Sequence, residues 1–216
     1  MFSLRLSFQV AAVVTLFTLL AGVPVSYVLA RKNFWGKELL DAVFTLPLVL
    51  PPTVTGFYLI VLLGRNGIIG RPVYNLTGWT AMFTWYAAAA ASFIVSIPLM
   101  IRTSRAAIES VDENLVNASY TLGHGELKTA LNVVLPLARK GILAGAVLSF
   151  ARAIGEFGAT LMFAGDIPGK TETMPLAIYS YLENGEWGRA RNLVILLTLL
   201  SLTVIYLANR LSKRIF

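Results

Sequence analysis

This 216-residue sequence is short of charge, since Asp, Glu, Lys and Arg together make up only 13% of the chain. Soluble domains carry about 25% of these residues. Apolar residues reach 56%, so the chain cannot cover its own surface with polar side chains. A soluble globular domain is therefore excluded, and lipid must serve as the solvent for much of the surface.

Cysteine is absent, and histidine occurs once, as His124. Without cysteine, neither a disulfide framework nor a thiolate metal site can form. A lone histidine without carboxylate or cysteine partners makes no metal site, and no nucleophile–base pair is visible along the chain. We therefore expect no catalytic, cofactor-binding or metal-binding residues. The pattern along the chain also indicates no soluble domain, so chemistry that needs one must come from another polypeptide.

Five apolar segments are long enough to cross a membrane core of roughly 30 Å, which takes about twenty helical residues. Backbone groups in lipid must be hydrogen-bonded within their own segment, so helix is the only suitable conformation. The sequence predicts an all-α polytopic membrane protein, with a single transmembrane domain over residues 1–216. The expected spans are approximately Ser7–Ala30, Leu40–Leu63, Ala81–Ile101, Gly141–Phe163 and Leu193–Ala208.

The basic residues indicate the membrane orientation. A polar insert, about residues 102–140, separates the third and fourth spans. If this insert is cytoplasmic, eleven basic residues lie on that side and six on the other, in agreement with the positive-inside rule. We therefore expect the amino terminus outside and the carboxyl terminus inside, and the net charge of +7 calls for no nucleic acid partner. The eleven are Arg31, Lys32, Lys37, Arg102, Arg105, Lys128, Arg139, Lys140, Arg210, Lys213 and Arg214; the six are Arg5, Arg65, Arg71, Lys170, Arg189 and Arg191.

The insert is expected to form two short helices. Ser110-Val111-Asp112-Glu113 has the form of a capping box, in which the Ser110 hydroxyl would accept a hydrogen bond from the amide of Glu113. The first helix, 113–122, would end at Gly123, which can adopt the left-handed conformation. The second, 126–134, would be closed by Pro136. Such a pair is either a simple surface loop or a docking element for a partner.

Polar residues also recur in the fourth span, where Ser149, Arg152, Glu156 and Thr160 are spaced by three, four and four. This spacing places them on one face of a helix. Charges near the middle of a span are costly and normally face a protein interior or a water-filled path. Arg152 and Glu156 can pair, so they form either a structural ion pair or part of an anion pathway.

The second span contains three prolines between Leu46 and Gly56. Proline removes a backbone donor and breaks a helix, and broken helices often mark transport sites. Pro51, Thr53 and Thr55 are therefore candidates for a translocation pathway or gate. The alternative is a kink that contacts no ligand.

The stretch Ala164–Thr171 matches a relaxed phosphate-loop pattern, with Ala in place of the first Gly. A phosphate loop needs a strand before it and a helix directly after it. Here a membrane span precedes the stretch and Pro175 soon follows, so we reject nucleotide binding at this point.

The insert resembles the cytoplasmic signature of permease subunits of binding-protein-dependent ABC importers. That family's pattern is Glu-Ala-Ala, three residues, Gly, nine residues and Ile-x-Leu-Pro. Asn117 replaces Glu and Ser119 replaces Ala, so the helix–Gly–helix form is kept while an acidic side chain is lost. The resemblance implies that the insert seats in a cleft of a partner ATPase and couples its movement to the spans. In this chain the pattern falls on Asn117, Ala118, Ser119, Gly123, Val133, Leu135 and Pro136.

From about Leu6 to Arg214 the chain is similar to the molybdate- and tungstate-type permeases of these type I importers, and the run Gly155–Thr160 favours molybdate. Tungstate or sulfate, or an ion-gradient-driven secondary anion transporter from another class, are the alternatives. The resemblance implies a homodimer in a bacterial or archaeal cytoplasmic membrane, an external oxyanion-binding protein, and cytoplasmic ATP-binding subunits. ATP and Mg²⁺ would bind those partners, and the permease itself would be no enzyme.

Overall fold

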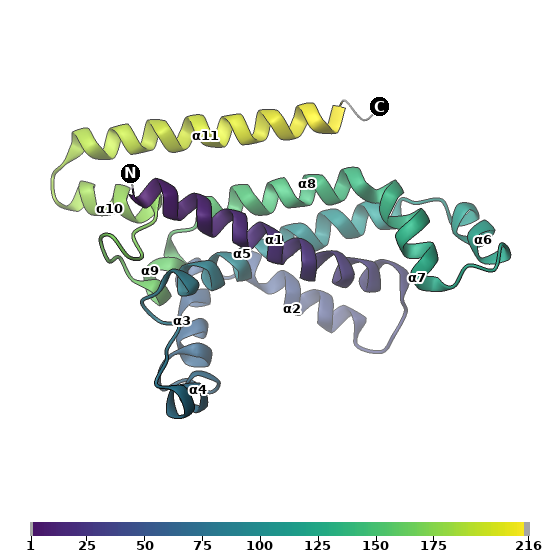
Figure 1. Cartoon of the computed structure of the whole chain (residues 1–216), viewed down its shortest axis with the longest axis horizontal. Coiled ribbons are helices and arrows are strands. Elements are labelled where there is room, and N and C mark those ends of the chain that lie inside the picture. The colour runs from purple at the N-terminus through teal and green to yellow at the C-terminus, as the bar shows by residue number, and fades with distance from the viewer. Residues whose placement is uncertain (1, 214–216) are drawn as a thin grey trace.

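The computed structural model describes residues 2–213, with side chains described through Tyr206. Helices and the turns between them make up this part of the chain. Its centre is formed by α1 (Phe2–Arg31), α5 (Trp85–Glu109) and α8 (Leu135–Ile154), which pack against one another, while α11 (Trp187–Lys213) lies against α8 (Figure 1). Three basic side chains counted for the orientation, Arg210, Lys213 and Arg214, lie outside the described part.

Small residues allow the central helices to approach closely. A Cβ at Gly141 would lie 2.2 Å from the Cβ of Ala107, and one at Gly145 would lie 2.9 Å from Sδ of Met100. Lipid tails are as apolar as leucine, so helices in a membrane associate through close packing, and small residues at their interfaces permit it. The α5–α8 contact therefore depends on these two glycines, because any larger residue at either position would push the helices apart.

The second predicted span is broken, as expected, into α2 (Lys37–Val49) and α3 (Pro52–Leu63), which are bent by 118° against each other. The break follows from steric restriction of residues before proline, which disfavours the helical conformation. Leu50, before Pro51, is extended with φ −71° and ψ 140°. Pro47, in contrast, lies inside α2 without ending it. As Figure 1 shows, α3 and α4 (Gly70–Thr77) project from the central bundle.

The predicted fourth span, Gly141–Phe163, is wrong as a single helix. Helix α8 ends at Ile154, and a second helix, α9 (Gly158–Ala164), starts after three non-helical residues. The Glu156 side chain occupies this break and accepts a hydrogen bond from the amide of Ala159, at the start of α9. Thr160 consequently lies on a different helix from Ser149.

The remaining boundaries also differ from those expected. Helix α5 begins at Trp85 because the Thr84 hydroxyl accepts a hydrogen bond from the amide of Ala87, and it continues to Glu109, into the polar insert. Between α9 and α11 lies α10 (Met174–Glu183), which the sequence did not predict. Among the described residues, four helical stretches are long and apolar enough to cross a membrane, and the bent pair α2–α3 makes a fifth. This agrees with the expected number of about five.

The stretch that resembles a phosphate loop is a turn that follows α9. The Thr171 hydroxyl is buried, donates to the carbonyl of Gly165 at 2.9 Å, and accepts from the amide of Ile167 at 3.1 Å. The hydroxyl is thus used to hold the turn together. No strand precedes the turn within the described residues, so the pattern lacks the surroundings of a phosphate loop.

Candidate functional site

The polar insert lies at one end of the bundle, far from the start of α1 (Figure 1). The Arg31 guanidinium donates through Nη2 to the carbonyls of Ile108 and Val111, at 3.0 and 3.1 Å. Lys32 Nζ lies 2.6 Å from the Glu126 carboxylate, and this hydrogen bond raises the pKa of Lys32. A buried apolar cluster lies beneath the insert and consists of Ile108, Val111, Val116, Val134 and Ala138.

The first helix of the insert, α6 (Glu113–Thr121), begins differently from the prediction. Asp112 is the capping residue and its carboxylate accepts from the amide of Asn114 at 2.9 Å. Ser110 instead donates to the carbonyl of Ala107. The expected Ser110 capping box is wrong because Ser110 still has helical dihedral angles at the end of α5, whereas a capping residue is normally extended.

The end of α6 matches the prediction. Gly123 has a φ of +78°, and its amide donates to the carbonyl of Tyr120, while the amide of His124 donates to the carbonyl of Ser119. These two bonds form a Schellman motif, in which a left-handed glycine satisfies the last carbonyls of a helix. A side chain at Gly123 would meet open space, so the constraint on this residue is conformational.

The second helix of the insert does not stop at Pro136, so that prediction is wrong. Helix α7 (Glu126–Thr129) leads into a π-helical turn, η1 (Ala130–Val134), and then directly into α8. The amide of Leu135 donates to the carbonyl of Ala130, five residues back. A π turn shifts the hydrogen-bond pattern by one residue, and Pro136, in the first turn of α8, follows it without interrupting the helix. The second helix of the insert and α8 therefore form one continuous rod, Glu126–Ile154.

Ser119 connects the two helices of the insert. Its side chain is buried, and its hydroxyl oxygen lies 2.9 Å from Oγ1 of Thr129 and 3.2 Å from Nδ1 of His124. Thr129 is fully buried. Serine therefore adds a hydrogen-bonded link at a position where the family pattern has alanine. Sequence reasoning noted the substitution but missed Thr129 and His124, because only the fold brings them to Ser119.

The first helix of the insert and the turn after it expose apolar residues as well as polar ones. Leu115 and Leu122 are 49% and 76% exposed, and Ala118 and Gly123 are exposed too. We call these four residues the outer face. Asn117 is also exposed but lines a cavity against the end of α1, and Leu135 and Pro136 lie at the start of α8. An exposed apolar surface on a polar insert is typical of a docking site.

A second group of predicted residues lies where the broken spans cross. A Cβ at Gly56 of α3 would lie 2.6 Å from the Cβ of Met162 and 3.1 Å from the Cα of Ala159, both on α9. A Cβ at Gly158 would lie 3.0 Å from the Cβ of Pro52. The two breaks, far apart in the sequence, thus meet at one point of the fold.

The predicted Arg152–Glu156 pair is present at this crossing. Nη1 of Arg152 lies 2.7 Å from Oε2 of Glu156, and Oε1 accepts from the amide of Ala159 at 2.7 Å. The Glu156 side chain is only 2% exposed, whereas that of Arg152 is 30% exposed. A buried carboxylate is tolerable only when paired and hydrogen-bonded, and here both oxygens have partners.

The other predicted pathway residues divide into buried and open positions. Ser149 is buried between α8 and α5 and donates to the carbonyl of Ser96 at 3.3 Å. Thr55 is buried too, and its hydroxyl has no hydrogen-bond partner among the described residues. Pro51 and Thr53 are exposed at the break. Among the predicted pathway residues, those open at the crossing are therefore Pro51, Thr53 and Arg152, and we call them the open surface of the crossing.

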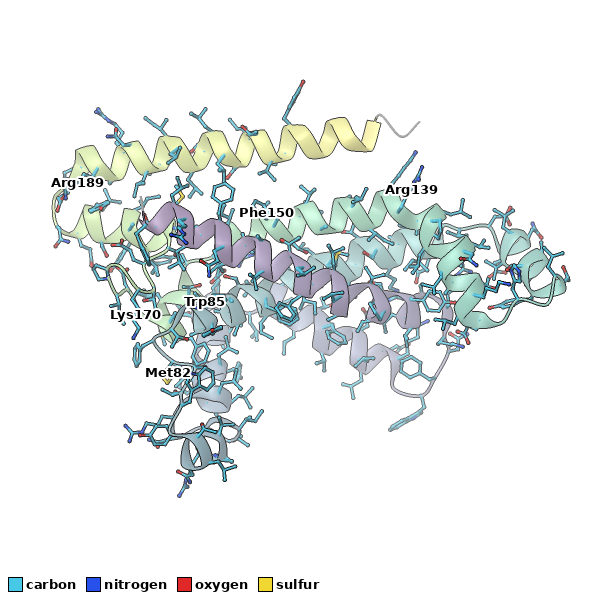
Figure 2. The ribbon with its side chains drawn as sticks, in the orientation of Figure 1. Met82, Trp85, Arg139, Phe150, Lys170 and Arg189 are labelled. Atoms are coloured by element: carbon cyan, nitrogen blue, oxygen red, sulfur yellow. The ribbon has the colours of Figure 1, made fainter. Side chains whose placement is uncertain are left out.

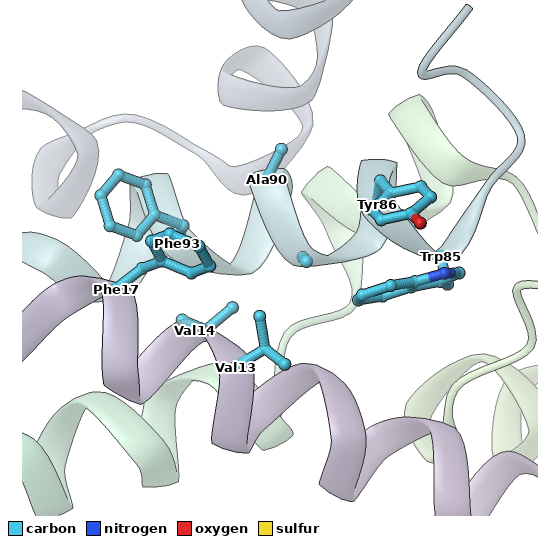
Figure 3. Close-up of a pocket in the computed structure, with 8 residues that line it drawn as sticks. Val13, Val14, Phe17, Trp85, Tyr86, Ala90 and Phe93 are labelled. Carbon is cyan, nitrogen blue, oxygen red and sulfur yellow. The ribbon is translucent and has the colours of Figure 1, made fainter.

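An apolar pocket of about 480 Å³ lies elsewhere, between α1 and α5 (Figure 3). It offers no charged side chain to an anion, so its chemistry suits lipid or another apolar surface. Its lining residues are Val13, Val14, Phe17, Trp85, Tyr86, Ala89, Ala90 and Phe93.

The chain matches known proteins over most of its length. Residues 22–216 match a family described as "Binding-protein-dependent transport system inner membrane component". The chain is similar to the molybdenum transport system permease protein ModB of Haemophilus influenzae, with 42% identity over 98% of this chain and 93% of that protein. With ModB of Escherichia coli K12 the identity is 44%, over 93% and 88% of the two chains.

The fold has a counterpart among solved structures. An inward-facing MetNI methionine ABC transporter matches with a TM-score of 0.78, covering 99% of this chain and 94% of that chain. The sequence identity is 16%, so this likeness concerns the fold alone. It supports the all-α permease architecture expected from the sequence.

We predict that Ser119 and Thr129 stabilise the insert as a pair. Ser119→Ala leaves the buried Thr129 hydroxyl without this partner, at a cost of about 1–3 kcal/mol, and Thr129→Val has a similar effect. The double variant should cost little more than either single one. Amide hydrogen exchange over residues 113–129 measures the local stability. Ser110→Ala, which removes an exposed hydroxyl, is the matched control, and additive effects of the two buried substitutions would contradict the pairing.

Proposed function

The chain belongs to the family of inner-membrane components of binding-protein-dependent transport systems, and we propose that it imports molybdate across the inner membrane. It is a transporter subunit and not an enzyme, and a separate ATPase hydrolyses ATP. The ion-gradient-driven transporter of another class is not favoured, because the family match covers residues 22–216. The observation that carries the proposal is the insert, a helix–Gly–helix element continuous with the fourth span.

We assign the insert to coupling with the ATPase. Ala118 and Gly123 lie in the outer face that would dock, Asn117 lies at its edge, and Ser119 holds the two helices together. Leu135 and Pro136 begin α8, so a push on α7 would pass along the rod into the membrane. Arg31 and Lys32 extend the same movement to α1.

Membership of this family also indicates which partners the chain works with. Permeases of this kind work with a partner ATPase and a substrate-binding protein, in a dimeric arrangement. We propose a second copy of this chain, cytoplasmic subunits that bind ATP and Mg²⁺, and an external oxyanion-binding protein. The insert would then be cytoplasmic and the amino terminus outside. The opposite placement of the insert and the start of α1 in Figure 1 supports this orientation.

For the ion itself, we propose a path over the open surface of the crossing. Molybdate carries two negative charges, and the partly exposed Arg152 offers a guanidinium, a group that binds oxyanions through several N–H donors. Thr53 adds a hydroxyl. Glu156, Ser149 and Thr55 are buried behind this surface and would fix its shape. Tungstate has the same charge and nearly the same size, so we expect it to compete with molybdate.

We predict that Gly123→Val prevents productive docking of the ATPase. A left-handed conformation costs a residue other than glycine about 1–2 kcal/mol, which corresponds to about a tenfold loss in a docking equilibrium. ATP-driven uptake and co-purification of the ATPase measure the effect. Gly125→Val is the matched control, because Gly125 has an ordinary φ of −72° and open space around it. Equal coupling in the two variants would remove Gly123 from the coupling element.

The role of Arg152 requires a double substitution. Arg152→Met alone leaves Glu156 buried without its cation, at a cost of up to about 3–5 kcal/mol, so lost uptake could reflect misfolding. Arg152→Met with Glu156→Gln removes both charges and keeps an acceptor for the amide of Ala159. We expect this double variant to fold and to lose most molybdate uptake.

The control for that experiment is the exposed pair Arg189–Glu186, at the opposite end of the bundle from the insert (Figure 2). Arg189→Met with Glu186→Gln makes the same change in charge and should leave uptake intact. Full uptake by the folded Arg152/Glu156 double variant would show that the pair only braces the helices.

A further inference from the structure

Two cavities adjoin along the end of α1, next to the insert. The first, of about 360 Å³, is polar, and the second, of about 440 Å³, is apolar. Tyr27 and Glu126 line both, so the two cavities are neighbours, and we treat them as one site. The site begins among the apolar residues of α1 and ends beside Arg31 and Lys32, where the helix leaves its apolar run.

The polar cavity contains charges of both signs. Arg31 and Lys32 line it together with Glu113 and Glu126. The Arg31 Nε is buried and has no hydrogen-bond partner among the described residues, although Nη2 is used by two carbonyls. Lys32 and Glu126 pair with each other but are each nearly half exposed. An anion alone would meet two carboxylates here, and a cation alone would meet two basic groups.

The apolar cavity is a groove between two helical segments. Val23, Pro24 and Val28 of α1 form one wall. Leu127, Leu131 and Leu135 contribute to the facing wall. Leu127 and Leu131 are more than half exposed, so a hydrophobic chain could lie against them. A polar cavity next to an apolar groove fits an amphiphile, and the amphiphile that surrounds a membrane protein is a phospholipid.

We propose that this site binds a phospholipid with a zwitterionic ethanolamine headgroup. The phosphate faces Arg31 and Lys32, the ammonium donates hydrogen bonds to Glu113 and Glu126, and an acyl chain lies in the groove past Val28. Ethanolamine fits better than choline because its ammonium retains N–H donors for carboxylates. The lipid thus connects α1 to the insert, a binding site separate from the transport pathway.

The test measures which lipid the purified, folded chain retains, and native mass spectrometry identifies that lipid. This measurement does not depend on transport activity. The protein is exchanged through mixed micelles with equal amounts of phosphatidylethanolamine, phosphatidylcholine and phosphatidylglycerol. We expect phosphatidylethanolamine to be retained preferentially. Equal retention of phosphatidylglycerol or phosphatidylcholine, or retention of none, would overturn the proposal.

Two sets of variants locate the site. Val28→Trp fills the groove and should abolish retention, whereas Val13→Trp, which fills the pocket of Figure 3 on the same helix, should not. Glu113→Gln with Glu126→Gln weakens the exposed Lys32–Glu126 ion pair but keeps the two Arg31 hydrogen bonds that hold the insert, and it should shift the preference to phosphatidylglycerol. Unchanged preference in this double variant, or equal retention by the two tryptophan variants, would contradict the assignment.

Discussion

The hydrogen-bonded rod from Glu126 to Ile154 is the feature on which the rest of the structure depends. It begins in the polar insert, passes through the π turn at Ala130–Val134 and continues into the fourth span. A joint between the insert and the span would absorb movement, whereas a continuous helix transmits it. Two further contacts join other helices to the insert, since Ser119 links α6 to α7 and Arg31 links α1 to the start of the insert.

At Ile154, where the rod ends, the constraint is the hydrogen bonding of a broken helix. A helix break within the apolar region leaves backbone N–H and C=O groups unpaired, and lipid cannot hydrogen-bond to them. The structure places the two breaks against each other, with glycines at Gly56 and Gly158 allowing the contact. Glu156 then satisfies both the start of α9 and the Arg152 guanidinium. Under the proposed function, we therefore expect movement of the rod to act on the place where polar groups are available to an anion.

Much of this fold can be predicted from the sequence, because lipid leaves few choices. Long apolar runs must be helices, and the spans were found on that basis. Gly123 was predicted to end α6 because a left-handed helix end favours glycine. The break at Pro51–Pro52 was predicted because proline removes a backbone donor and breaks a helix.

The predictions that were wrong failed for physical reasons. Ser110 and Asp112 are both good capping residues, and only the length of α5 decides between them. Pro136 normally marks a helix end, but a π turn before it removes the conflict. Gly155 permits a break without requiring one, so the end of α8 depended on the Glu156 side chain. The partnership of Ser119 with Thr129 arises only once the two helices of the insert have packed.

Molybdate uptake into proteoliposomes tests the central claim most directly. The vesicles would contain this chain with its ATPase, with the oxyanion-binding protein outside and ATP within. We expect uptake only when all three proteins and ATP are present, and without any ion gradient. Uptake by this chain alone under an ion gradient, with no ATPase, would contradict the conclusion that the insert receives work from a partner.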